Sequence, residues 1–294
     1  MNKILSCFLL VLLLSGCEKS VVFKLDDTAS SLVVDASIEN GQPPLVLLSN
    51  SLNYFSEISP EILLNSFVHG AVITITDGSK QQVLKEYSYK TAPFVDIYYY
   101  TIDSLARNNF LGEFNKTYSM EIKLGDKVYN SSTTIPALTK KIDSLWWRKS
   151  PNNPDTTQVI LMGKVTDPPG FGNYIRFFTK TGNSGAYLPG LTSVFDDQII
   201  DGTTYDIEVE HGVDRNTKID PETYSFFNRG DSVTIKFCNI DKTNFDFWRT
   251  MEYSYASIGN PFSTPTKVLG NIRGGALGYF GGYAVQYKSL IIPK

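Results

Sequence analysis

From Ser31 onward, short segments of alternating apolar and polar residues are separated by turn residues, and this pattern constrains the fold most strongly. In residues 71–76, the odd-numbered positions would face one side of a strand and the even-numbered positions the other. Residues 118–124 and 128–134 flank Gly125-Asp126-Lys127, which is a hairpin signal. The spacing predicts a mainly β protein that begins with an immunoglobulin-like or prealbumin-like β-sandwich.

The dipeptide Ile135-Pro136 marks the expected boundary between two domains. We predict an N-terminal β-sandwich over residues 31–136 and a second, β-sandwich-like, β-rich domain over residues 137–294. The stretch 50–68 is long for a connection within a sandwich, and it contains a cluster of apolar residues. It is expected to form a short helix or a functional loop.

The C-terminal domain is expected to carry one helix, over residues 244–258. Thr243 or Asn244 can cap its N-terminus, and Gly259-Asn260-Pro261 ends it. Apolar and aromatic side chains recur within it at helical spacing, which predicts that this stripe packs against the second sheet. The stripe comprises Phe245, Trp248, Met251 or Glu252, Tyr255 and Ile258.

The first 16 residues have the features of a secretory signal peptide. Lys3 supplies a positive charge, and an apolar run from Ile4 to Leu14 follows it. This run is too short to span a bilayer, which needs roughly 20 apolar residues. Leu14-Ser15-Gly16-Cys17 matches a lipobox, so we expect signal peptide 1–16 to be removed, Cys17 to be lipidated and residues 17–30 to form a tether.

Few residues suited to catalysis or metal binding remain in the mature chain. Cys7 leaves with the signal peptide and Cys17 carries the lipid, so Cys238 is left without a disulfide partner. His69 and His211 are too few for a Cys/His zinc site and argue against a hydrolase triad. The formal net charge of −3 does not suggest nucleic acid as a partner. We therefore expect a protein that is not an enzyme, has no cofactor and has no catalytic residue.

Two groups of residues are candidate sites. Asp196, Asp197 and Asp201 form the densest acidic group, and a loop there could offer oxygen ligands to calcium. The spacing does not match an EF-hand, and a solvated turn is the alternative. Trp146 and Trp147 are adjacent and must point to opposite faces of a strand. One of them could be a platform for a sugar ring or a partner protein, or both could be buried between the domains.

Several stretches, taken together and in order, resemble a known family. The most specific run is residues 230–234, followed by residues 240–242 and 245–250. The other matching pieces are residues 32–36, 70–77, 142–145, 195–202, 260–263, 271–275 and 280–283. They are similar to a Bacteroidota lipoprotein family known as a domain of unknown function (DUF4249-like), over nearly the whole mature chain.

Members of that family resemble outer-membrane lipoproteins whose genes often neighbour those of TonB-dependent transporters. The resemblance implies a lipid-anchored outer-membrane protein, on the periplasmic or the cell-surface face, that acts as an accessory or substrate-binding component beside such a transporter. It provides no catalytic residues. The alternative is a carbohydrate-binding module or a glycan-active enzyme that uses paired carboxylates. A glycan or a peptide remains open as the ligand.

Overall fold

A computed structural model describes residues 30–52, 59–92, 95–103, 105, 110–150, 155, 157–182, 185–260, 262–264 and 266–294. The predicted signal peptide, Cys17 and all of the predicted tether except Ser30 lie outside the described residues. None of the described helices has the length and apolar character needed to cross a membrane.

Strands dominate the described structure, which confirms the mainly β prediction. The N-terminal half comprises β1 (Leu32–Glu39), β2 (Leu45–Asn50), α2 (Pro60–Ser66), β3 (Val72–Thr76), β4 (Gln81–Val83), β5 (Lys85–Ala92), β6 (Val95–Thr101), β7 (Lys116–Leu124) and β8 (Lys127–Ile135). The C-terminal half comprises β9 (Lys141–Lys149), β10 (Gln158–Thr166), β11 (Tyr174–Thr181), β12 (Leu188–Phe195), β13 (Thr204–Val209), β14 (Phe227–Asn228), β15 (Ser232–Ile240), α3 (Lys242–Ala256) and β16 (Leu277–Ile291). The short helix expected within residues 50–68 is α2, and the predicted hairpin joins β7 to β8.

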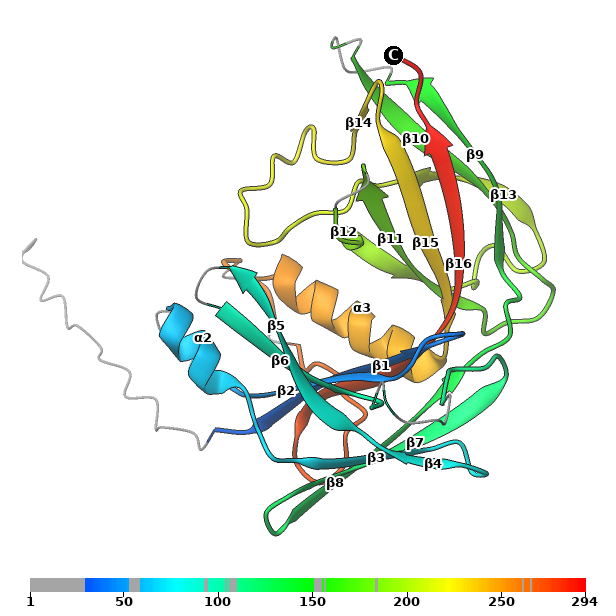
Figure 1. Cartoon of the computed structure of the whole chain (residues 1–294). Helices are drawn as coiled ribbons and strands as arrows, with labels where there is room; N and C mark the ends of the chain where they lie inside the picture. The colour runs from blue at the N-terminus through cyan, green and yellow to red at the C-terminus, as the bar shows by residue number, and fades with distance from the viewer. Residues whose placement is uncertain are drawn as a thin grey trace, which may run out of the picture.

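An eight-stranded sheet runs through both halves of the chain in the order β12-β11-β15-β16-β1-β2-β6-β5 (Figure 1). The last strand, β16, makes this continuity possible because it is long enough to pair with two partners. Its first part, residues 277–283, pairs in parallel with β1, and residues 283–291 pair in antiparallel fashion with β15. The sheet therefore crosses the expected domain boundary at residue 136.

Two smaller sheets each cover part of the long sheet. The sheet β4-β3-β7-β8 encloses an N-terminal core with β1, β2 and β16, which includes Val34, Ile73 and Tyr118. The sheet built on β10, with β9, β13 and β14, encloses a second core with β11 and β15, which includes Leu161 and Phe237. The alternation seen in β3, β7 and β8 thus reflects one buried face per strand, whereas parts of β15 and β16 are buried on both faces.

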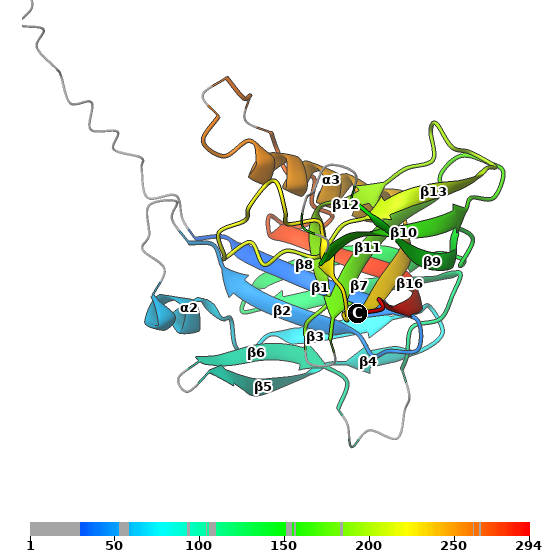
Figure 2. The same ribbon diagram turned by 90° about the horizontal axis from the view of Figure 1, so that it is seen from above.

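Helix α3 packs on the face of the long sheet that lies opposite the N-terminal core. Figure 2 shows the resulting layers, with α3, then β1 and β2, then β3. The N-cap is Asp241 rather than Thr243 or Asn244: one carboxylate oxygen accepts the Asn244 N–H at 2.8 Å, and the other accepts the Thr134 N–H of β8 at 3.1 Å. The cap therefore starts the helix and ties it to a second element.

The buried face of α3 differs in part from the predicted stripe. Phe245 is buried as expected, and so is Glu252, one of the two alternatives at its position, but Phe247 outside the stripe is buried as well. Tyr255 and Ile258 are exposed, the latter by 70%. The predicted stripe was wrong at its C-terminal end: Tyr255 is exposed in the last turn of α3, and Ile258 lies beyond Ala256, where the helix ends.

Glycines allow β16 to lie between α3 and β8. A Cβ at Gly281 would lie 2.7 Å from Nδ2 of Asn244 in α3, and one at Gly282 would lie 2.5 Å from the carbonyl oxygen of Thr134 in β8. Both distances are too short for ordinary contact. These glycines therefore serve the close backbone packing that the sequence suggested for the Gly-rich tail.

Candidate functional site

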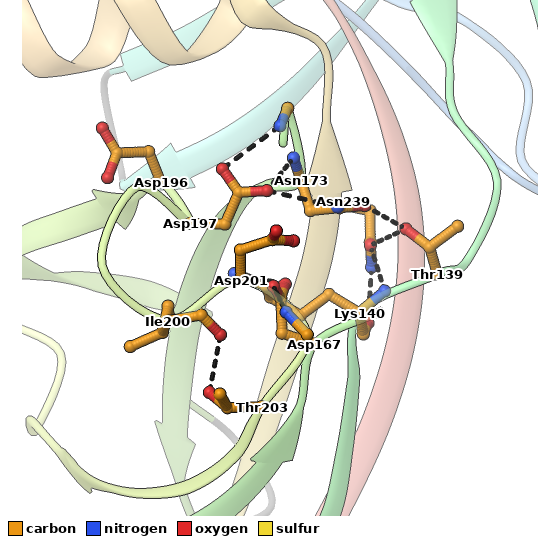
Figure 3. Close-up of polar contacts among 12 residues, drawn as sticks. Thr139, Lys140, Asp167, Asn173, Asp196, Asp197, Ile200, Asp201, Thr203 and Asn239 are labelled. Atoms are coloured by element: carbon orange, nitrogen blue, oxygen red, sulfur yellow. Dashed lines mark hydrogen bonds and ion pairs between the residues drawn. The ribbon is translucent and has the colours of Figure 1, made fainter. Parts of the chain in front are cut away.

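Three aspartates from two loops form a compact cluster (Figure 3). Asp167 follows β10, while Asp197 and Asp201 follow β12, and carboxylate oxygens of the three lie within 4.8 Å of one another. Asp196 lies apart from the cluster, so the structure brings together two of the three aspartates singled out in the sequence. The third member, Asp167, is about 30 positions earlier in the chain and was not anticipated.

Backbone N–H groups of one loop satisfy much of this negative charge. The Asp197 carboxylate accepts the N–H groups of Gly172 and Asn173 at 3.2 and 2.9 Å, and Asp201 accepts the Gly170 N–H at 2.6 Å. Burial alone would raise the pKa of the Asp197 carboxyl, but these hydrogen bonds hold it below its ordinary value. The cluster therefore fastens residues 170–173 to the loop after β12.

A buried lysine supplies a cation to the same cluster. The Lys140 side chain is fully buried, and its Nζ lies 2.9 Å from a carboxylate oxygen of Asp167, which is equally buried. Among the described residues, each of these two atoms has only the other as its polar partner. The Lys140 backbone is fixed by Asn239, whose side-chain amide accepts its N–H and donates to its carbonyl oxygen, both at 2.8 Å.

The cluster contains its own counter-ion, Lys140, which offsets part of its negative charge. Three carboxylates and one ammonium still leave an excess of negative charge. Burial, together with the charges of Asp167 and Asp197, raises the pKa of Tyr205 to about 12, so this phenol stays protonated. The buried ammonium and the backbone hydrogen bonds suit a structural clamp better than a calcium site, which prefers oxygen ligands alone.

The adjacent tryptophans lie on opposite faces of β9, as predicted. The pairing of β9 with β10 skips Asp143, and this bulge places Trp147 on the inner face, where it packs against the second core. The Arg229 guanidinium lies 4.5 Å from the Trp147 ring centre. Both tryptophans are half-buried, and neither lines the two cavities described below. A role for Trp146 or Trp147 as a ligand platform stays a prediction.

A cavity of about 800 Å³ lies between α3 and the long sheet. The outer face of β1 and the first residues of β16 form its floor, α3 forms one wall, and residues 267–276 form the other. Its lining is mostly apolar and aromatic. The wall on α3 consists of Phe247, Trp248, Met251 and Tyr255. A cavity of this size and character, with a few polar groups, is typical of a small-molecule site.

One carboxylate, that of Asp35, lies on the floor of this aromatic pocket. Asp35 occupies the middle of β1, a position that disfavours aspartate, and pairs in register with Tyr279 of β16. Its side chain faces the cavity and is reached by solvent there. Protein nevertheless surrounds it closely enough that desolvation raises its pKa, while the Tyr279 hydroxyl and the Arg176 charge partly oppose this rise.

Beneath the pocket, buried polar groups hold the aromatic wall in place. The Tyr283 hydroxyl accepts the Trp248 indole N–H at 3.1 Å and an N–H of buried Arg176 at 3.4 Å. The Arg176 guanidinium lies 3.3 Å from the Trp248 ring centre and donates to the Ser193 hydroxyl. Buried Glu252 of α3 in turn accepts the Ser193 N–H at 3.0 Å. This network fixes Trp248 before any ligand arrives.

A second, polar groove of about 710 Å³ lies over β3, β7 and β8. Hydroxyl and amide side chains dominate it, and Gly270 and Ile272 line both this groove and the aromatic pocket. Its charged members are Glu121 and Arg273. Residues 270–273 thus separate two cavities of opposite character.

The fold and the aromatic pocket define a mainly β protein with a ligand-sized cavity between a helix and a sheet. The sequence matches the family model "Domain of unknown function (DUF4249)" over residues 18–289, so the chain belongs to the DUF4249 family. This confirms the family resemblance seen in the sequence.

Other comparisons add little about function. Among solved structures, the chain is similar to the crystal structure of a candidate carbohydrate-binding protein from Bacteroides uniformis. The two share 12% identity with a TM-score of 0.21, over 75% of this chain and 88% of that chain. A similarity this weak carries no functional argument. Among curated proteins, no sequence matches this one.

Proposed function

We propose that this protein is a non-enzymatic binding protein whose ligand site is the aromatic pocket between α3, β1 and β16. The observation that carries the proposal is the composition of this pocket. Aromatic side chains form a wall in which a buried hydrogen bond holds Trp248 in place, and a single carboxylate lies opposite on the floor. Preformed apolar walls with few polar groups bind small ligands with little reorganisation.

The distribution of carboxylates supports binding rather than glycan hydrolysis. A glycoside hydrolase needs two carboxyl groups on either side of the scissile bond. Asp35 is the one acidic residue among the described residues that line the pocket. The clustered aspartates are held by Lys140 and backbone amides, away from this cavity.

The proposal places the binding protein at the outer membrane, held by lipid on Cys17. The lipobox in the sequence supports the anchor, and family membership supports extending the expected role beside a TonB-dependent transporter to this chain. In that arrangement the pocket would hold a ligand close to the transporter that imports it. Bacterial lipoproteins carry more than one acyl chain, and two anchoring signals give stable attachment.

Affinity purification of the tagged lipoprotein from its own outer membrane tests this role. We expect a TonB-dependent transporter to be recovered with the wild-type protein and lost with Cys17→Ala, which stays unlipidated. Recovery of no transporter, together with hydrolytic activity on a panel of glycans, would refute the accessory role and favour the enzyme.

The polar groove supports a second candidate function, the binding of a glycan. Hydroxyl and amide groups on one sheet face suit a polyhydroxylated ligand. A glycan array distinguishes the two candidates. Binding that Arg273→Ala abolishes and that a pocket-filling Ala276→Trp leaves intact would assign ligand binding to the groove.

A further inference from the structure

No cation among the described residues forms a salt bridge with Asp35, and this inference rests on the pocket being a ligand site as proposed. Among the described residues, Asp35 forms no salt bridge, and its polar neighbours are the Tyr279 hydroxyl and the through-space charge of Arg176. Burial raises the pKa of Tyr279 well above its ordinary value, so its hydroxyl remains a hydrogen-bond donor. Solvent reaches this carboxylate, and a ligand that covers it must supply a cation or a donor in place of that water.

The nearest guanidinium is already engaged elsewhere. Arg176 stacks on Trp248 and lies 4.6 Å from the ring centre of Phe178. Its N–H groups are directed to the Ser193 and Tyr283 hydroxyls. It therefore supports the aromatic wall from below and lowers the pKa of Asp35 only through space.

The other charged groups near the cavity leave the carboxylate on its floor available to a cation. Lys267 lines the outer wall and is exposed, and it is not among the described groups that lower the pKa of Asp35. Glu252 is buried behind the wall and accepts hydrogen bonds from Ser193. The floor therefore presents an uncompensated carboxylate beneath aromatic and aliphatic surfaces, and both features attract an ammonium group.

We infer that the pocket takes ligands that carry a protonated amine on a flat or aliphatic body. The ammonium group lies on the Asp35 carboxylate beside the Tyr279 hydroxyl. The body packs against Phe247, Trp248 and Met251 of the wall on α3. A ligand with an anionic group in place of the ammonium is repelled by the Asp35 carboxylate, and a neutral isostere cannot form the ion pair.

Calorimetric titration with tryptamine and tryptophol tests the inference, since these probes share an indole ring and differ in an amine against a hydroxyl group. The full-length lipidated protein is used in nanodiscs, with empty nanodiscs as the blank. We expect tryptamine to bind the wild type roughly tenfold more tightly than tryptophol, because a charge-assisted hydrogen bond to the Asp35 carboxylate is stronger than a neutral one. Asp35→Asn should remove this preference by weakening tryptamine alone.

The matched control is Asp206→Asn, which removes a carboxylate from an exposed position of β13 that lines neither cavity and should leave tryptamine binding unchanged. Equal affinity of the two probes for the wild type overturns the charge inference and leaves the pocket as a site for neutral ligands. Binding of neither probe overturns the inference and the proposed pocket together. The comparison of probes on the wild type remains decisive even where Asp35→Asn fails to fold.

Discussion

Replacing Lys140 with methionine tests the internal counter-ion of the aspartate cluster. Methionine retains most of the side-chain length and removes the charge. The Lys140 and Asp167 side chains are both fully buried, and each is the other's polar partner among the described residues. Removal of one member of such a pair leaves an uncompensated buried charge and costs about 3–5 kcal/mol. Here Asp197 and Asp201 also repel the Asp167 carboxylate, since oxygens of all three carboxylates lie within 4.8 Å of one another.

Urea unfolding at neutral pH measures this loss, with Lys141→Met as the matched control. Lys141 is the neighbouring residue and is exposed, so its replacement should change the free energy of unfolding by less than about 0.5 kcal/mol. Adding Asp167→Asn to Lys140→Met should recover part of the loss, because it removes one of the carboxylates that repel. Calcium should leave the melting temperature of the wild type unchanged.

Two results would contradict the reasoning about this cluster. One is a loss below about 1 kcal/mol for Lys140→Met, which is the level of an exposed ion pair. The other is a clear rise in the melting temperature of the wild type with calcium, which would return Asp197 and Asp201 to the role of metal ligands first considered from the sequence.

Three further predictions concern stability and reactivity. Lys116 lies 2.7 Å from Asp77 and holds the pKa of that carboxyl far below its ordinary value. The contribution of Asp77 to the free energy of unfolding should therefore be complete above the ordinary pKa of 3.8 and be lost as the pH falls through the depressed value. The free energies of unfolding of wild type and Asp77→Asn should therefore converge in acid. Gly282→Ala places a Cβ against the Thr134 backbone and should cost about 1–3 kcal/mol in urea unfolding; an unchanged midpoint would contradict the close packing. Burial raises the pKa of Cys238 to about 12, so in a variant lacking Cys7 and Cys17 this thiol should react with a disulfide reagent only after urea is added. Rapid labelling of the native protein would refute that.

Local sequence patterns were sufficient for much of the secondary structure. Period-two alternation identified β3, β7 and β8, and the Gly-Asp turn predicted the hairpin between β7 and β8. Helical spacing located α3 to within two residues at each end. These features depend on neighbours in the chain, so a single sequence contains them.

Long-range strand pairing could not be predicted, because no local sequence pattern records it. The parallel pairing of β1 with β16 joins Val33 to Leu277 and creates the floor of the aromatic pocket. Asp35 looked like one more polar position in an alternating strand, and its importance comes from α3 lying over it. In the same way Asp197 was recognised, whereas Asp167 and Lys140 reach it only through folding.

The central claim is that the aromatic pocket binds ligand, and methionine methyl groups report on it directly. Met251 lines this pocket, while the Met120 side chain is buried in the N-terminal core and Met162 lines neither cavity. With ¹³C-methyl methionine in the mature chain carrying Cys17→Ser, titration with tryptamine should shift the Met251 resonance and leave Met120 and Met162 in place. A shift of Met120 alone, or of no methionine at saturating probe, would contradict the account.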